Sequence, residues 1–312
     1  MGCLKLAHIK ESKPVLKCVW NAQKQPKTGV GMYDYGARFY DPQLGRFHTQ
    51  DRFAEKYIDF SPYQYGANNP VRFIDINGDS LWISYRGNDI LYENGNLSNK
   101  DGTTYTGKGV KTDKNGNTTI KGFLKHTVNA LGSMSSTQVG SGLLTELQGS
   151  DNNFTIERGS SNTFIADNTT ASFANIPELQ AVSNSMGSNG SGGTIKFNPR
   201  SSSSGFNTAG NTSRPAYVGL AHELFHGQDA NRGTLYYGSN YTNPITGVSY
   251  QATYQGLEKS EWRAVYNENI LRKQAGLPLR THYGLQQSPG GMMPTGPRLL
   301  DSKNILYNYI VR

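Results

Sequence analysis

The chain has 312 residues, a formal net charge of +8 and 35% hydrophobic residues. Its length is sufficient for about two domains, and the low hydrophobic content with 36 glycines predicts short elements joined by many turns, which excludes a helical bundle. The positive charge is spread out: residues 1–78 carry 11 Lys/Arg and 7 Asp/Glu, and residues 79–312 carry 20 and 16, so each part has a net charge of +4. A dedicated nucleic-acid surface is therefore not expected, because such surfaces concentrate their charge.

The cysteines and the first residues narrow the class further. Cys3 and Cys18 form no Cys-x-x-Cys pair, which excludes a disulfide framework and a cysteine-type zinc site. The first 17 residues carry lysines and a glutamate where a signal peptide needs an apolar run, so no N-terminal signal peptide is expected. No apolar run approaches the roughly 18 residues of a transmembrane helix, so no membrane span is expected either.

The N-terminal quarter divides into a polar lead-in, residues 1–28, and a segment rich in aromatic residues, residues 29–79. In the second segment, aromatic residues alternate with turn signals such as Asp-Pro and Asn-Gly, which predicts short β-strands with tight turns. A small β-meander is the simplest interpretation of that pattern.

Residues 29–79 also resemble the Rhs repeat-associated core of polymorphic toxins. The resemblance rests on YDYGARFYDP at 33–42, LGRF at 44–47, SPY at 61–63 and NNPV at 68–71. It implies that the residues after Asp79 form a variable C-terminal cargo, usually a toxin. The sequence departs from the family in lacking a repeat array before residue 29 and the usual D-P-x-G-L, although Asp51 and Asp75 are candidates for the aspartates of self-cleavage.

The remaining chain is expected to contain a β-rich connector, residues 80–132, and a catalytic domain, residues 133–312. The stretch LWISYRGNDILYENG alternates like a pair of strands, and a helix is predicted over residues 121–134. Polar residues 159–193 are expected to form an exposed loop, and the tail from residue 281 an irregular segment. Further elements are predicted in chain order: a helix at 140–149, strands at 152–159 and 192–200, and helices at 216–232 and 257–275.

The first of the two later helices contains LAHELFHGQD, residues 220–229, with His222 and His226 four positions apart. Residues at this spacing lie on one helix face, so both imidazoles can point at a common zinc ion, which binds four ligands tetrahedrally. Glu223 follows His222 and is placed to take a proton from zinc-bound water and to pass it to the leaving amine. Leu220, Leu224 and Phe225 are expected to pack the helix; a surface histidine pair without metal is the alternative.

A third protein ligand is needed, and the helix at 257–275 offers Glu258, Glu261 and Glu268. The extended pattern H-E-x-x-H-x-x-G-x-x-H is absent, because Asp229 and Arg232 stand where its glycine and last histidine would be. We predict Glu261 as the ligand, ahead of Glu268 and Glu258. A glutamate that is not a ligand would be solvated, or would accept a hydrogen bond from a ligand histidine.

These two helices resemble the zinc metallopeptidase family of the secreted bacterial effector NleD. The resemblance covers roughly residues 190–284 and rests on HELFH, Glu261 with Ala264, the segment from Glu268 to Arg272, and a Gly-x-Pro-x-Arg-x-x-Tyr end at residues 276–283. It implies a zinc enzyme that cuts protein substrates. Tyr283 is predicted to donate a hydrogen bond to the oxyanion, and Arg280 to do the same or to bind a substrate carboxylate; both also have ordinary structural roles.

The sequence therefore predicts an α+β fold: a small β-rich Rhs remnant before a zincin-like domain with a mixed sheet, an active-site helix and a glutamate-bearing second helix. The predicted function is a zinc-dependent endopeptidase, the C-terminal toxin of an Rhs-type protein that is delivered into target cells and has a cognate immunity protein. The strand GTIKFNP is a candidate sheet edge for an extended substrate. A non-enzymatic or decayed toxin cassette that binds a partner is the alternative, and a nuclease toxin is a weaker one.

Overall fold

The computed structural model describes residues 23–24, 33–34, 39–41, 44, 46–50, 63, 81–183, 188–236, 238, 240–242 and 247–306. The chain divides into two compact units, Met1–Gly78 and Asp79–Arg312. The first unit contains an antiparallel sheet in which the strands follow chain order: β1 (Gln23–Lys24), β2 (Tyr33–Asp34), β3 (Phe39–Asp41) and β4 (Arg46–Phe47). Most of the predicted Rhs segment, including Asp51 and Asp75, lies outside the described residues, so that interpretation stays a prediction.

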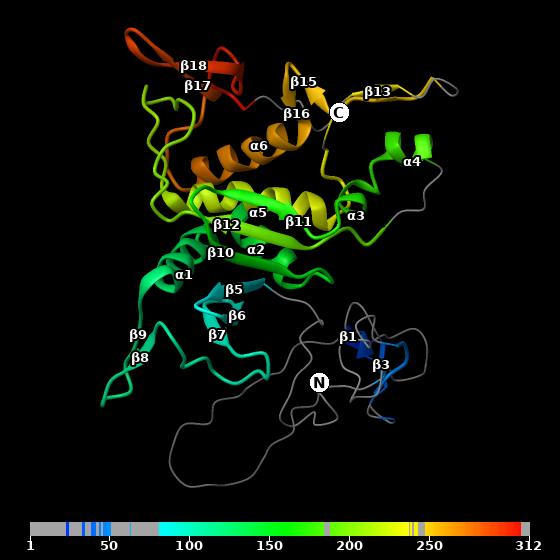
Figure 1. Cartoon of the computed structure of the whole chain (residues 1–312), viewed down its shortest axis with the longest axis vertical. Coiled ribbons are helices and arrows are strands. Elements are labelled where there is room, and N and C mark those ends of the chain that lie inside the picture. The colour runs from blue at the N-terminus through cyan, green and yellow to red at the C-terminus, as the bar shows by residue number, and fades with distance from the viewer. Residues whose placement is uncertain are drawn as a thin grey trace. The chain divides into compact units, whose positions relative to one another are not determined.

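The second unit is built on a mixed six-stranded sheet of order β11-β12-β10-β5-β6-β7 (Figure 1). Strand β10 is parallel to both β12 and β5, and the other pairs are antiparallel. The strands are β5 (Leu81–Tyr85), β6 (Asn88–Glu93), β7 (Asn96–Ser98), β10 (Phe154–Arg158), β11 (Thr163–Ala166) and β12 (Gly193–Phe197).

Strands β5, β6 and β7 form a meander because two tight turns follow one another. Arg86-Gly87 and Asn94-Gly95 all have positive φ, from 48° to 88°, as two-residue hairpin turns of the primed types require. The predicted strand pair is confirmed, with a third strand added. Because Leu81, Ile83 and Ile90 are fully buried, this meander contributes to the core of the unit.

Helices cover the buried face of the sheet. The helices are α1 (Gly122–Ser135), α2 (Gln138–Gln148), α3 (Thr169–Phe173), α4 (Pro177–Ser183), α5 (Ala216–Asn231) and α6 (Lys259–Gln274). Helix α5 packs against β11 and β12 and also against α1, α2 and α6, so it lies between the sheet and α6 (Figure 1). Gly227 permits this close approach: a Cβ at that position would lie 3.3 Å from the Phe154 ring.

The smaller elements are two-stranded. They are β8 (Val110–Thr112) with β9 (Thr118–Ile120), β13 (Tyr241–Thr242) with β14 (Ser249–Tyr250), β15 (Thr253–Tyr254) with β16 (Leu257–Glu258), and β17 (His282–Ser288) with β18 (Gly291–Arg298). The long β17–β18 hairpin stands where an irregular tail was predicted. The predicted exposed loop at 159–193 was also wrong, since it contains β11, α3 and α4.

The structure differs from the expected separation of a connector, residues 80–132, from a catalytic domain, residues 133–312. Residue 132 lies inside helix α1, and β5 pairs with β10 in one sheet. Long-range pairing of this kind leaves little trace in local sequence, which is why composition suggested a boundary there.

We expect a fragment of residues 79–312 to fold and a fragment of residues 133–312 to remain unfolded. The shorter fragment loses the first part of α1 and the strand that pairs with β10, and the loss of the fully buried Leu81, Ile83 and Ile90 alone removes about 1.5–3 kcal/mol each. Circular dichroism melts of both fragments measure this. A cooperative transition in the shorter fragment would contradict the single sheet.

Candidate metal centre

Helix α5 presents its two histidines towards α6. His222 and His226 are each 7% exposed, their ring centroids lie 5.0 Å apart, and the ring planes are nearly perpendicular at 83°. Leu220, Leu224 and Phe225 are buried in the core, as predicted for the packing residues of this helix. The predicted helix and its two faces are confirmed.

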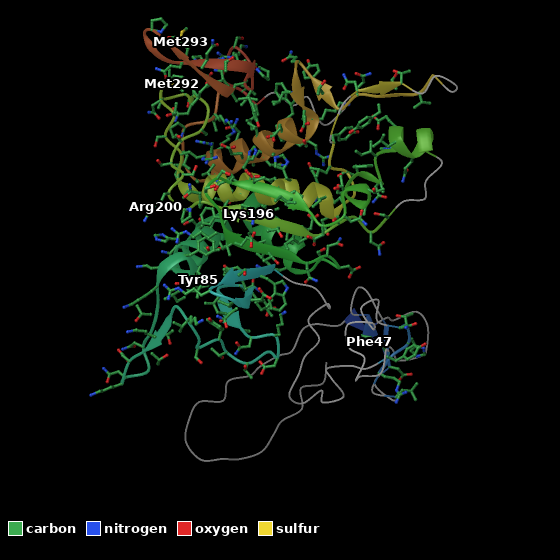
Figure 2. The ribbon with its side chains drawn as sticks, viewed as in Figure 1. Phe47, Tyr85, Lys196, Arg200, Met292 and Met293 are labelled. Carbon is green, nitrogen blue, oxygen red and sulfur yellow. The ribbon has the colours of Figure 1, made fainter. Side chains whose placement is uncertain are left out.

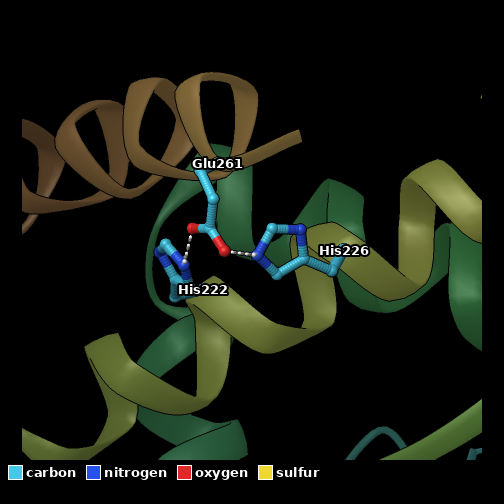
Figure 3. A group of neighbouring side chains, drawn as sticks. All are labelled: His222, His226 and Glu261. Carbon is cyan, nitrogen blue, oxygen red and sulfur yellow. Dashed lines mark hydrogen bonds and ion pairs between the residues drawn. The ribbon is translucent and has the colours of Figure 1, made fainter. Parts of the chain in front are cut away.

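Helix α6 brings Glu261 between the two imidazoles (Figure 3). Its Oε2 lies 3.0 Å from Nε2 of His222, and its Oε1 lies 3.4 Å from Nε2 of His226. One ligand atom from each of the three residues lies within 4.8 Å of the others. The structure therefore brings together the three residues predicted as metal ligands, and Glu258 and Glu268 are not part of this group.

Glu268 instead lies behind His222. Its fully buried carboxylate accepts a hydrogen bond from Nδ1 of His222 at 3.1 Å, on the side of the ring away from Glu261. Such a contact fixes the orientation and tautomer of a histidine whose other nitrogen binds a metal. A glutamate other than Glu261 was expected either to be solvated or to accept a hydrogen bond from a ligand histidine. Glu268 has the second role.

Two arginines neutralise this carboxylate. Arg272 Nε donates to Glu268 Oε1 at 2.8 Å, and Arg280 Nη1 lies 3.2 Å from Oε2. Arg272, itself fully buried, also donates to the Pro278 carbonyl and to the Ser204 hydroxyl. The role of these arginines was missed from the sequence, although the i, i+4 spacing of Glu268 and Arg272 was a usable signal.

The charges of the group are strongly coupled. Burial disfavours a charged His222, but its hydrogen bonds with Glu261 and Glu268 and the nearby Glu223 charge raise its pKa to about 9. Burial likewise opposes charge on Glu261 and Glu268, yet the histidines, and for Glu268 the two arginines, hold both pKa values well below the ordinary range. The group thus favours ionised carboxylates on both sides of the His222 ring.

Glu223 is half-buried next to His222. Its charge contributes to raising the pKa values of His222 and Tyr283, which places it within electrostatic reach of both. Within the described ranges, no hydrogen bond or ion pair engages its carboxylate. The residue predicted as the general base is therefore beside the group and available to accept a proton.

Tyr283 and Arg280 border the group. Burial, followed by the charge of Glu261 and a hydrogen bond with it, raises the pKa of Tyr283 well above its ordinary value, so the phenol keeps its proton. The Arg280 guanidinium lies 4.9 Å from the Tyr283 ring centre and donates to the backbone carbonyls of His282 and Tyr283 at 3.3 and 2.6 Å. Arg280 therefore has the structural role, whereas Tyr283 remains a candidate donor.

Asp229 and Arg232, which stand where the extended zinc pattern has its glycine and last histidine, form ion pairs with other residues. Asp229 forms an ion pair with Arg263 at 3.0 Å, and Arg232 forms one with Glu146 at 2.6 Å. Burial raises the pKa of Asp229 to about 6, against the opposing effect of Arg263. This is consistent with a third ligand that comes from α6 and not from the end of α5.

A match to a family model decides the classification. The model of the peptidase M91 family, described as an effector protein, matches residues 111–283, which is more than half of the chain. The chain belongs to the peptidase M91 family of effector proteins. The match contains the histidines, Glu261 and Glu268, and it ends at Tyr283, so membership in a peptidase family agrees with the protein substrate expected from the sequence.

One similar curated protein is salivary gland surface protein 1 of Aedes aegypti, which is 50% identical over 49 residues. The matched segment is 16% of this chain and 1% of that protein, so the chain spans only a small part of its relative. Across the described residues of this family member, every helix falls short of the length and apolar character needed to cross a membrane.

We expect Glu268→Gln to lower the free energy of unfolding by about 3–5 kcal/mol, because it leaves the buried guanidinium groups of Arg272 and Arg280 without a carboxylate. Urea denaturation measures the loss. Glu258→Gln, at the residue directly before α6, is the matched control: Glu258 is outside this network and should change stability by less than about 0.5 kcal/mol. Equal effects of the two substitutions would contradict the assigned role of Glu268.

Proposed function

We propose that the chain is a zinc-dependent endopeptidase with a zincin-like catalytic domain, the toxin part of an Rhs-type polymorphic toxin. The observation that carries the proposal is the convergence of His222, His226 and Glu261 from two packed helices. Membership in a family of effector peptidases supports the same reaction class.

The donor set fits zinc. Two imidazole nitrogens and one carboxylate oxygen are the ligands of a catalytic zinc site that leaves a coordination position open for water. The contact between Nδ1 of His222 and Glu268 supplies the carboxylate that supports a ligand histidine. His222, His226 and Glu261 would hold the ion, which supplies Lewis acidity for the activation of water and the polarisation of the peptide carbonyl.

The chain's own residues supply the proton transfers. Glu223 accepts a proton from the attacking water and hands it to the leaving amine, a role for which its half-buried carboxylate, without a partner in the described part of the chain, is suited. Tyr283 keeps its proton and donates a hydrogen bond to the carbonyl oxygen as negative charge develops there. Arg280 positions Tyr283 through its backbone carbonyl and its ring.

The predicted substrate edge must be revised. Strand β12, which contains GTIKFNP, is internal, because β11 and β10 pair with its two sides. Its proposal as an edge strand was therefore wrong. The sheet edge next to α5 is β11, and an extended peptide would have to pair there.

The proposed setting is delivery of this domain into a target cell together with a cognate immunity protein in the producing cell. The support is the resemblance of residues 29–79 to the Rhs core and the effector description of the family. The target protein is expected to be cut inside that cell.

We expect purified protein to bind about one zinc per chain, and His222→Ala, His226→Ala and Glu261→Ala each to reduce this content strongly, because each removes one of three ligands. Elemental analysis after dialysis measures the content. His126→Ala is the control, since His126 is an exposed residue of α1. Unchanged zinc content in the three variants would contradict the site.

We expect Glu223→Gln to retain zinc and to lower the rate of casein cleavage by about 10²–10⁴-fold, because the amide cannot accept the proton. The rate is followed with fluorescently labelled casein. Glu93→Gln, in strand β6, serves as the control and should leave the rate unchanged. If Glu223→Gln retained both the cleavage rate and the toxicity of the parent in cells, a peptidase mechanism through Glu223 would be excluded.

A further inference from the structure

The β17–β18 hairpin has the composition of a binding surface. None of its residues, 282–298, is buried, and Met292 and Met293 near its tip are 46% and 55% exposed (Figure 2). Successive strand residues point to opposite faces, so each face of the tip carries one of the two methionines, beside the paired Gln286 or Gln287 of β17. Methionine is flexible and polarisable, and it is used often at surfaces that accept varied apolar partners.

Strand β17 also lacks the prolines and permanent charges that usually protect an exposed sheet edge, whereas Pro294 and Pro297 lie in β18. Arg298 at the base of the hairpin is its one residue with a permanent charge, and among the described strands no third one pairs with β17 or β18. A two-stranded hairpin is marginal by itself, and an uncharged edge invites pairing with another chain.

The two edges are not equivalent. Pro294 is paired with Leu285, and proline has no N–H to donate across the pair, so this pair belongs to the class without cross-strand hydrogen bonds. The backbone polar groups of Leu285, and of Gln287 two residues on, then point outward from β17. The outer edge of β18 lacks a donor at Pro294, so β17 is the edge that can accept a strand.

The root of the hairpin shows that this edge takes a third segment. Thr281 N–H donates to the Phe206 carbonyl at 2.7 Å, while Leu299 N–H donates to the Thr281 carbonyl at 2.8 Å on the opposite side. A short segment of the same chain, at Phe206, thus pairs with the backbone at Thr281. The outer edge of β17 beyond Gly284 extends in the same direction.

The edge begins at the candidate catalytic group. Gly284 follows Tyr283, which hydrogen-bonds Glu261, and Arg280 joins the first two carbonyls of β17 to Glu268. The family match ends at Tyr283, so residues 284–298 lie outside the matched part. A surface that is continuous with the candidate metal centre is accessible to the same polypeptide that the centre would cut.

We propose that the outer edge of β17 and the methionine tip form an exosite that binds an extended, uncharged, apolar segment of the protein substrate, away from the bond that is cut. This inference rests on the proposed peptidase function. The substrate segment adds a strand to β17 through the outward groups of Leu285 and Gln287, and its apolar side chains cover Met292 and Met293.

Binding tests the exosite without turnover. The probe is fluorescently labelled β-casein, an unfolded and apolar polypeptide, and the parent is the Glu223→Gln chain. In this background, Met292→Ser with Met293→Ser should raise the Kd for casein about tenfold, since two partly buried methionines are lost from the contact. Gln287→Pro, which removes one outward N–H, should raise it several-fold. Leu44→Ser, at a residue 62% exposed in the other unit, is the control and should have no effect.

Cleavage gives the second readout. With Glu223 restored, the methionine double variant should raise the KM for casein and leave kcat unchanged. A tetrapeptide centred on the first casein bond that is cut reaches about 7 Å to either side, whereas Gln286 and Gln287, opposite the methionines, lie about 10 and 13 Å along β17 from Tyr283. Cleavage of this tetrapeptide should therefore be the same in parent and variant.

Three results would overturn the exosite. They are no binding of casein by the Glu223→Gln chain, equal casein affinity of the methionine variant and its parent, or equal loss of tetrapeptide and casein cleavage. Sedimentation that shows a dimer lost on Met292→Ser with Met293→Ser, with casein affinity unchanged, would assign the edge to a second copy of the chain. Absence of zinc and of all cleavage would remove the peptidase function, while the binding measurement would still decide the exosite.

Discussion

The buried carboxylate of Glu268 is the constraint on which the rest of the site depends. A carboxylate without exposure is costly in a medium of low dielectric, and here two guanidinium groups and an imidazole nitrogen offset that cost. Because Arg272 and Arg280 hold the carboxylate on one side, its remaining contact fixes the His222 ring. The other nitrogen of that ring must then face Glu261. The orientation of His222 towards Glu261 is therefore set by Glu268, which lies seven residues after Glu261 in α6.

The position of α5 adds a second constraint. Eleven of its sixteen residues are buried, so the helix is enclosed by the sheet, α1, α2 and α6, and the two histidines cannot turn to solvent. A core helix that carries two imidazoles needs polar partners on one face, and α6 supplies them in Glu261 and Glu268. The contacts of Glu261 and Glu268 with the two histidines therefore also fix how α6 crosses α5.

Local sequence was sufficient to predict how residues are arranged within one element. His222, Glu223 and His226 follow from a helix period, and the packing residues between them follow from the same period. The choice between Glu261 and Glu268 could not be made in this way, because the two lie on one face of α6 and only the crossing of the two helices decides which one lies between the histidines. The edge position predicted for GTIKFNP was wrong for a related reason: β11 is a four-residue strand in a polar stretch, and nothing near GTIKFNP signals that it is paired on both sides. The union of β5 with β10 across about seventy residues is likewise a property of long-range pairing.

Arg280 connects the chemistry to the surface beyond it. One guanidinium binds the carboxylate behind His222, lies against the Tyr283 ring and holds the first carbonyls of β17. The direction in which the hairpin leaves the domain is thus fixed by the same group that supports the histidine. Among the described residues, none from 284 to 298 forms a hydrogen bond or ion pair with that guanidinium, so the tip and edge of the hairpin can vary in sequence without disturbing the histidines. Residues 284–298 of such an enzyme can change, and with them the polypeptide that it binds, while its reaction is kept. The reason is that the carbonyls held by Arg280 end at Tyr283.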